Sequence, residues 1–333
     1  MTSFRTLLPL SLFVICLGAD AQDAPGSDLV RSPIRASIGE DARADRDWHV
    51  AWLHDTREHL RDFFEGVGRT VDGWFGDEQH DEGRRLVNGR LILNGLWRRD
   101  DGIQTGVNFR GKFDLPNLEN KAYLYFGQDN ERELITDQPD EFSRHQRLLA
   151  DDDDEDRAFF AGLGYAIREN IDLRGGIKGG LKPYVQARYQ RKWYPASSDE
   201  IEFRETLFWQ TSEGVGLTTT LNYRHIFTDQ VDFRWRNSAT VSQSTDALAW
   251  QSSAGTYVRF GLQRQVSLEA LIRGETGSTL PVAEYGVRAI YRTALYEDWL
   301  LGEFIVGHFW PRDEDDAERD RSWAAGMGIE INF

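Results

Sequence analysis

The feature that most constrains the fold is a two-residue alternation of apolar and polar side chains from about residue 86 to the end of the chain. In the segment 103–114, Val107 and Phe109 fall on one face, and Asn108 and Arg110 fall on the other. Successive side chains of a β-strand point to opposite faces, so this period indicates strands with one apolar and one polar side. The same pattern recurs in the segments 183–193, 231–242, 266–275 and 322–333.

About fourteen such segments are present, and most have the length that a tilted strand needs to cross a bilayer. Together they predict an all-β fold, a transmembrane antiparallel up-and-down β-barrel of 12–14 strands. The short pair around Gly175 to Gly180 leaves the number open, because merging its two members would favour twelve. The expected limits are 86–98, 103–114, 121–128, 158–167, 171–178, 183–193, 201–210, 215–227, 231–242, 247–260, 266–275, 282–294, 299–310 and 322–333.

The connections between these segments differ in length. Short ones are expected at 115–120, 168–170, 228–230, 261–265 and 295–298, and two long acidic ones lie at 129–156 and 312–321. Outer-membrane barrels combine short periplasmic turns with longer external loops. We therefore expect both chain ends on the periplasmic side and the acidic loops outside.

The sequence predicts four segments in chain order, which are a signal peptide, a polar leader, a helix and the barrel. Residues 1–21 have a basic start, a short apolar run and a small-residue cleavage site, which is typical of a secretory signal peptide. Residues 22–44 form a polar leader predicted to be disordered, and 84–333 form the barrel. The single cysteine, Cys16, lies in the signal segment, so the exported chain would contain neither disulfides nor thiolate metal sites.

Residues 45–77 carry a different period. Apolar side chains from Trp52 to Phe75 recur largely at steps of three and four, while Asp55, Glu58 and Asp62 occupy the other side. This pattern predicts a periplasmic amphipathic helix. We expect it to plug the barrel, to lie on the inner leaflet, or to dock on a partner.

The net charge of −16 is unevenly distributed. The segment 129–156 holds 12 acids and 3 bases, and 312–321 holds 6 acids and 3 bases, so most of the excess lies in the two acidic loops. Nucleic acid is therefore excluded as an expected partner.

Tryptophans lie near the ends of the expected strands, where they would form interfacial girdles against outer-membrane lipid and lipopolysaccharide. They are Trp97, Trp193, Trp209, Trp299, Trp310 and Trp323.

The last segment, Trp323 to Phe333, ends on an aromatic residue after alternating apolar positions. It resembles the C-terminal signal by which Gram-negative outer-membrane barrels engage the barrel-assembly machinery. The stretches 207–216, 235–240, 285–288 and 298–300 resemble segments of a family of uncharacterised proteobacterial outer-membrane proteins. This resemblance covers roughly residues 45 to 333 and implies a barrel in the cell outer membrane, with no activity to carry over.

No constellation in the sequence predicts an enzyme, a cofactor or a metal site. His225 with Asn222, and His308 on another segment, are interpreted as interfacial or interior polar residues, because no nucleophile motif accompanies them. The run Asp151–Asp156 lacks the spacing of a calcium loop, and we interpret it as a solvated charge run. The five-residue steps between His49, His54 and His59 place them on different helix faces.

The polar faces of the strands carry an excess of bases. The residues expected to line a pore are Arg110, Arg188, Arg204, Arg234, Arg236, Arg259, Arg273, Arg288, Arg292, Glu269 and Glu284. Further inward bases are Arg90, Arg98, Lys112, Arg174, Lys178, Lys192 and Arg224, and further acids are Asp114, Asp172, Glu202, Asp232, Glu275, Glu303 and Glu330.

This face supports two functions equally. One is a water-filled pore with mild anion preference, and the other is an internal ion-pair lattice that stiffens a structural barrel docking a periplasmic partner through its helix. An outer-membrane lipid-modifying hydrolase is a weaker third alternative.

Overall fold

The structure is a computed structural model that describes residues 57–59, 61–62, 66, 87–100, 102–115, 121–130, 157–245, 247–261, 263–312 and 318–333. The expected signal peptide and polar leader, and most of the expected helix, lie outside these residues. The described residues 57–59, 61–62 and 66 are helical, and the full helix over 45–77 stays a prediction. Among the described residues, no helix is long and apolar enough to span a membrane.

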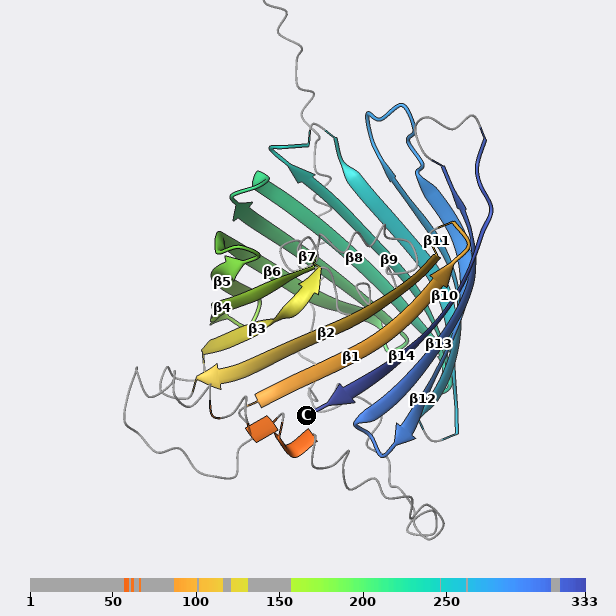
Figure 1. The fold of residues 1–333 in the computed structure, drawn as a ribbon, viewed down its shortest axis with the longest axis horizontal. Coiled ribbons are helices and arrows are strands. Elements are labelled where there is room, and N and C mark those ends of the chain that lie inside the picture. The colour runs from red at the N-terminus through yellow and green to blue at the C-terminus, as the bar shows by residue number, and fades with distance from the viewer. Residues whose placement is uncertain are drawn as a thin grey trace, which may run out of the picture. The chain divides into compact units, whose positions relative to one another are not determined.

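Fourteen antiparallel strands form one closed barrel, so the upper of the two expected numbers is confirmed (Figure 1). Each strand pairs with its neighbours in sequence, and β1 pairs with β14. The strands are β1 (Val87–Arg98), β2 (Gly102–Leu115), β3 (Ala122–Asn130), β4 (Arg157–Arg168), β5 (Ile171–Lys178), β6 (Lys182–Ala196), β7 (Asp199–Gln210), β8 (Gly214–Thr228), β9 (Val231–Ser242), β10 (Ala249–Phe260), β11 (Arg264–Glu275), β12 (Glu284–Tyr296), β13 (Leu300–Pro311) and β14 (Ser322–Asn332).

The glycine-rich segment 175–180 belongs mostly to a strand. The expected strand at 171–178 is present: Gly175 of β5 pairs with Val185 of β6, Gly176 pairs with Tyr184, and the turn begins only at Gly179. A Cβ on Gly176 would collide with the backbone of Ala161, so glycine here permits close approach of β4 to β5.

The two rims of the barrel differ as the sequence predicted. We call the rim that holds the start of β1 and Phe333 the terminal rim, and its connections are the short ones after β2, β4, β6, β8, β10 and β12. The opposite rim, the loop rim, receives both acidic segments, which follow β3 and β13. Four register shifts, at 166/168, 193/196, 226/228 and 294/296, all lie at the terminal rim, where bulges allow tight turns.

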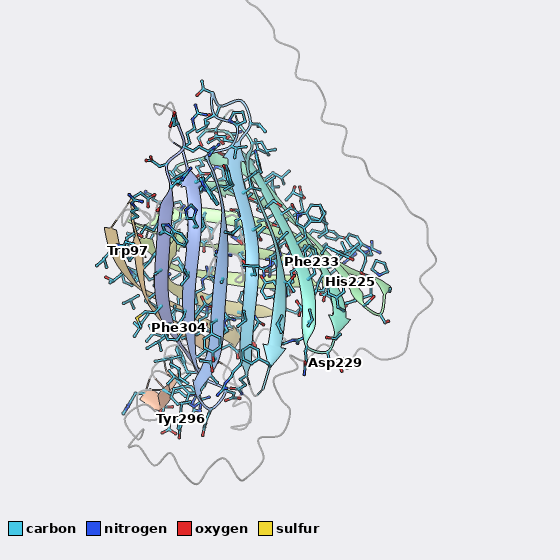
Figure 2. The ribbon with its side chains drawn as sticks, turned by 90° about the vertical axis from the view of Figure 1, so that its right-hand side faces the viewer. Trp97, His225, Asp229, Phe233, Tyr296 and Phe304 are labelled. Carbon is cyan, nitrogen blue, oxygen red and sulfur yellow. The ribbon has the colours of Figure 1, made fainter. Side chains whose placement is uncertain are left out.

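The outer face of the barrel is apolar and exposed. Phe159 is 65% exposed and Leu268 is 63% exposed, although both lie within strands. Aromatic side chains gather toward both rims: Trp97, Trp209 and Trp323 lie near the loop-rim ends of their strands, and Phe227, Tyr296 and Phe304 lie toward the terminal rim. Figure 2 labels Trp97, Tyr296 and Phe304. Trp299 departs from the expected girdle, because it is only 2% exposed and packs with Leu300 and Ile331.

Phe333 extends the pairing of β1 with β14 that closes the barrel. Phe333 and Gly89 exchange two backbone hydrogen bonds, each of 2.9 Å between nitrogen and oxygen. The Phe333 ring lies over Gly89, where a Cβ would overlap it, and packs against the buried cluster of Phe113, Leu115 and Ala122. Because Gly89 has no side chain, the Phe333 ring can lie directly over its backbone.

We predict that Gly89→Val displaces this ring and destabilises the folded barrel by about 1–3 kcal/mol, the usual cost of overpacking. The measurement is the temperature at which the compact form is lost in heat-modifiability gels. Gly95→Val is the matched control, because a Cβ on Gly95, also in β1, meets no atom within 4 Å. Equal effects of the two substitutions would contradict the role of the Phe333 position.

Candidate functional site

The inner face of the barrel carries the candidate site. On β9, Arg234 and Arg236 flank Trp235, whose exposed ring belongs to the outer face, so both arginines point inward. By the same alternation, each of the eleven residues expected to line a pore lies opposite the exposed apolar face of its strand. Several of these arginines and glutamates contact one another directly.

Asp232 on β9 is the centre of the first group of interior charges. Its side chain is 0% exposed and lies 2.7 Å from Arg234 Nε, 3.1 Å from Arg224 Nη2 and 3.4 Å from Arg259 Nη2. These guanidinium groups come from β8, β9 and β10, so a single carboxylate joins three adjacent strands. A buried carboxylate needs such partners, because removal from water disfavours its charged form.

A second group crosses β9 to β12. Arg288 donates to Glu269 Oε2 through Nε at 3.0 Å and through Nη2 at 2.6 Å. Tyr257 donates to the other oxygen of Glu269 and accepts from Arg236. All four side chains are buried, so the chain of contacts holds them in fixed positions.

The third group lies on β3 to β6. Asp172 Oδ2 accepts hydrogen bonds from Tyr123 at 2.6 Å, from Arg174 at 2.9 Å and from Arg188 at 2.8 Å. Next to it, the buried aromatic rings of one inward cluster pack together: Tyr123, Tyr125, Phe160, Tyr184 and Phe208. This part of the inner face is therefore aromatic as well as basic.

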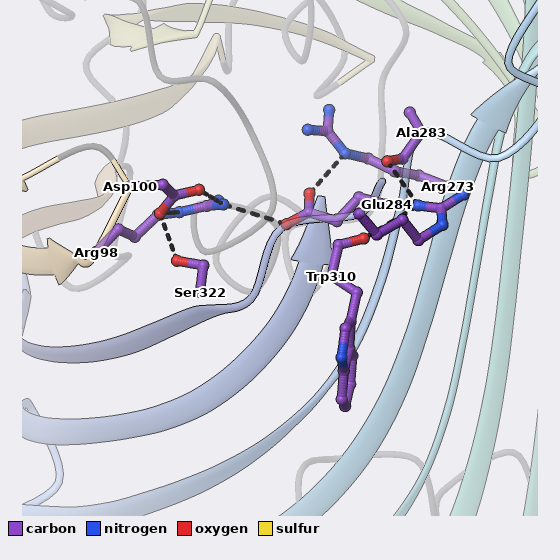
Figure 3. Close-up of polar contacts among 8 residues, drawn as sticks. Arg98, Asp100, Arg273, Ala283, Glu284, Trp310 and Ser322 are labelled. Carbon is purple, nitrogen blue, oxygen red and sulfur yellow. Dashed lines mark hydrogen bonds and ion pairs between the residues drawn. The ribbon is translucent and has the colours of Figure 1, made fainter. Parts of the chain in front are cut away.

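The fourth group lies at the loop rim (Figure 3). Glu284 accepts from Arg98 at 3.2 Å and from Arg273 at 3.0 Å, and Arg98 also bonds Asp100 at 2.8 Å. Ser322 donates to Asp100. Partial burial raises the pKa of Asp100, but the hydrogen bonds from Arg98 and Ser322 outweigh it and hold that pKa below its usual value.

An apolar patch interrupts the inner face beside this fourth group. Leu96, Leu271, Phe309 and Ala324 form a buried cluster on β1, β11, β13 and β14. Next to it, a cavity of about 50 Å³ lies over Gly326 and Gly328, with Ile92 and Leu301 among its apolar walls and Arg292 and Glu303 at its polar side. Arg292 Nη2 and Glu303 Oε2 are 2.7 Å apart.

Sequence reasoning missed some of the polar residues of the inner face. Glu200 lies before the expected start of its strand, yet it contacts Lys192 at 2.8 Å in an ion pair outside the four groups. Tyr123 and Tyr257 were not assigned to the interior, although their alternation with neighbouring outward residues carries the signal. Asp100 and Ser322 are turn and strand-end residues, for which a period of two gives no orientation.

The residues considered for an enzyme do not form a catalytic site. His225 Nδ1 lies 2.7 Å from Asp199 Oδ1 at the terminal rim, but the Ser198 hydroxyl donates to Asp199. His308 packs against Trp310 and Trp323 on a distant strand, whereas Asn222 points to the opposite face from His225. No hydroxyl or thiol of the described residues hydrogen-bonds either histidine, so no nucleophile is activated there.

No group of three histidine, cysteine or acidic residues in the described part of the chain is arranged to hold a metal ion. Asp151–Asp156, His49 and His54 lie outside the described residues.

Neither a scan against family models nor a search of curated proteins gives a match. Solved structures do give matches. The anion-selective porin from Comamonas acidovorans is 11% identical with a TM-score of 0.44, and the match covers 74% of this chain and 98% of that one. The loop-deleted OmpT of Vibrio cholerae is 7% identical with a TM-score of 0.42, covering 74% and 98%. The KdgM porin in complex with disordered oligogalacturonate is 9% identical with a TM-score of 0.38, covering 73% and 99%. At these values the likenesses carry no conclusion about function.

We predict that Asp232→Asn destabilises the barrel by about 3 kcal/mol, the lower end for removing one partner of a buried ion pair, because its arginines partly reach water. The measurement is the midpoint of thermal unfolding in detergent. The matched control is Asp229→Asn, because Asp229 is exposed in the neighbouring turn at the terminal rim (Figure 2). A midpoint for Asp232→Asn equal to that of the control would show that the carboxylate does not hold the three arginines.

Proposed function

We propose that the protein is an integral outer-membrane barrel whose interior forms a narrow pore with a preference for anions. The exposed apolar outer face supports the membrane location, because a soluble protein rarely exposes so large an apolar surface. Aromatic side chains near both rims suit the headgroup regions of outer-membrane lipid and lipopolysaccharide. The expected signal peptide and the C-terminal Phe333, as the contact for the barrel-assembly machinery, complete the proposed export route.

The observation that carries the anion preference is the composition of the interior ion-pair groups. Asp232 is shared by three arginines, and Asp172 is shared by Arg174 and Arg188. Within each of these two groups, the arginines outnumber the carboxylate that they share. A lattice of this composition is compatible with an anion-preferring pore, because the groups that stiffen the wall contain more bases than acids.

The excess of positive charge lies on the inner wall, close to the path of an ion through the proposed pore. Charges in a narrow pore lie within a few ångströms of the passing solute, between walls of low dielectric, and salt screens them poorly. The acidic segments connect strands at the loop rim, and the sequence predicts that they lie outside the barrel, where the field of an exposed charge decays over about 8 Å at physiological salt. The interior residues thus determine the selectivity, with Arg234 and Arg259 contributing most near the terminal rim.

A second candidate is a structural barrel that docks a periplasmic partner through its N-terminal helix. Arg57 Nε donates to the carbonyl oxygen of Asn332 at 3.1 Å, and its guanidinium lies 5.2 Å from the centre of the Trp299 ring. This contact favours a helix held at the terminal rim over one that fills the interior. A helix in that place is available to a periplasmic partner.

The pore is tested by the reversal potential of refolded protein in a planar bilayer across a salt gradient. We expect wild type to prefer anions, and Arg234→Gln/Arg259→Gln to lower that preference severalfold, because the group around Asp232 then loses its excess charge. Arg264→Gln is the control, because Arg264 is exposed at the terminal rim and does not face the interior. A cation preference in wild type would refute the proposal.

The position of the helix is tested by deletion of residues 45–77. We expect single-channel conductance to stay unchanged, because the contact of Arg57 holds the helix at the rim beside Trp299. An increase in conductance would instead place the helix in the interior as a plug.

A further inference from the structure

We infer that the outer face of β6 to β8 is the interface between two copies of this chain, with Glu205 of each copy paired to Arg191 of the other. This inference rests on the proposed membrane location, although it does not depend on the pore. It arises from a charged side chain on the part of the barrel wall that faces lipid.

Glu205 lies in the middle of the apolar outer wall. On β7 it alternates with Phe203 and Leu207, which share its face, whereas Arg204 and Thr206 point inward. It is four residues from Trp209 toward the loop rim, and four from Ile201 toward the terminal rim. Ile201 pairs with Trp193, so the carboxylate is midway between two exposed tryptophans. A carboxylate at this depth would lie in the hydrocarbon region, where charge is costly.

The chain itself satisfies Glu205 only in part. Thr219, directly opposite on β8, donates one hydrogen bond to Glu205 Oε2 at 2.9 Å. None of the ion pairs among the described residues includes Glu205. A neutral hydroxyl does not balance a full negative charge, so the side chain is suited to a basic partner.

Other polar side chains on the outer wall differ in this respect. Ser252 donates to Asn237 at 2.8 Å and accepts from Trp235 Nε1 at 3.0 Å, and Asn237 donates to the carbonyl oxygen of Leu221 at 3.3 Å. This trio is neutral and internally hydrogen-bonded, so it needs no partner to lie against lipid. We therefore place the interface at Glu205 and not at the neutral trio of Ser252, Asn237 and Trp235.

The complementary charge is on the adjacent strand. Arg191 of β6 pairs in register with Phe203, faces outward and is exposed, and its guanidinium lies 5.4 Å from the centre of the Trp193 ring. It is absent from the ion pairs of the described residues. The patch therefore carries one negative and one positive group, and it is complementary to itself.

Symmetry allows the two groups to meet. Two barrels inserted in the same direction are related by a two-fold axis along the membrane normal, which keeps each residue at its own depth. Arg191 and Glu205 differ in level by two residues, about 7 Å along a strand, which the long arginine side chain can span. Each such dimer would contain the Glu205–Arg191 pair twice, and both charges would leave the lipid.

The experiment measures oligomeric state by light scattering in mild detergent and by cross-linking in isolated outer membranes. We expect a dimer for wild type. Glu205→Arg and Arg191→Glu should each lower the dimer association constant by about tenfold or more, because like charges then face each other at two places. The double reversal, Glu205→Arg/Arg191→Glu, should restore the dimer because it exchanges the two charges.

Three controls make the result specific. Heat-modifiability gels report that each variant folds, and Arg264→Glu, on β11 away from the patch, should leave the dimer unchanged. Wild type that is monomeric in both measurements overturns the inference, as do folded double-reversal protein that stays monomeric and cross-linking of this face to a different protein. Fractionation separates the two proposals, because absence from the outer membrane refutes the location itself, whereas a monomer in that membrane refutes the interface alone.

Discussion

The structure depends on the pairing of its first and last strands. A strand edge in hydrocarbon exposes backbone donors and acceptors that no water can satisfy, so only a closed sheet tolerates that environment. Here β14 meets β1 in a continuous register that ends with the two hydrogen bonds between Gly89 and Phe333. The terminal aromatic ring covers this last pair and packs on Phe113. Closure and anchoring of the chain end are thus achieved by the same residue.

Closure also explains the chemistry of the interior. Once the apolar faces of fourteen strands point outward, every polar face points inward, and the wall must hold many charges at close quarters. The arrangement around Asp232 meets this constraint, because one carboxylate joins arginines from three strands and is shielded by them. Arginine suits the role better than lysine, since its planar group reaches a carboxylate through several donors and is more weakly hydrated. The same contacts brace neighbouring strands against one another.

The architecture could be predicted from sequence because a period of two is a direct consequence of strand geometry, and the connections follow from where it breaks. The strands, the two rims and the inward orientation of residues such as Arg234 follow from this pattern. The pattern does not predict which side chains of different strands contact one another, because these contacts depend on the register between strands. Nothing in the sequence indicates that Asp232, and not Glu303, collects three arginines, or that Trp299 is buried while Trp97 is exposed. For Glu205, the alternation pattern alone places a charge on the apolar face. Only the structure shows that this charge lies midway between the two rims, at the depth of the hydrocarbon region.

The charges of the barrel are arranged along its axis as well as around it. At the loop rim, Arg98 and Arg273 are balanced by Glu284 and Asp100, and the acidic segments 131–156 and 312–321 attach there. Toward the terminal rim, the group around Asp232 has a clear positive excess. In the proposed pore, an anion would therefore pass from a neutral or negative entrance to a basic interior, so the loop rim sets how often it enters and the arginines set how it is discriminated from a cation. These two properties reside in different residues, because the arginines that would discriminate between ions are the ones that Asp232 joins across three strands.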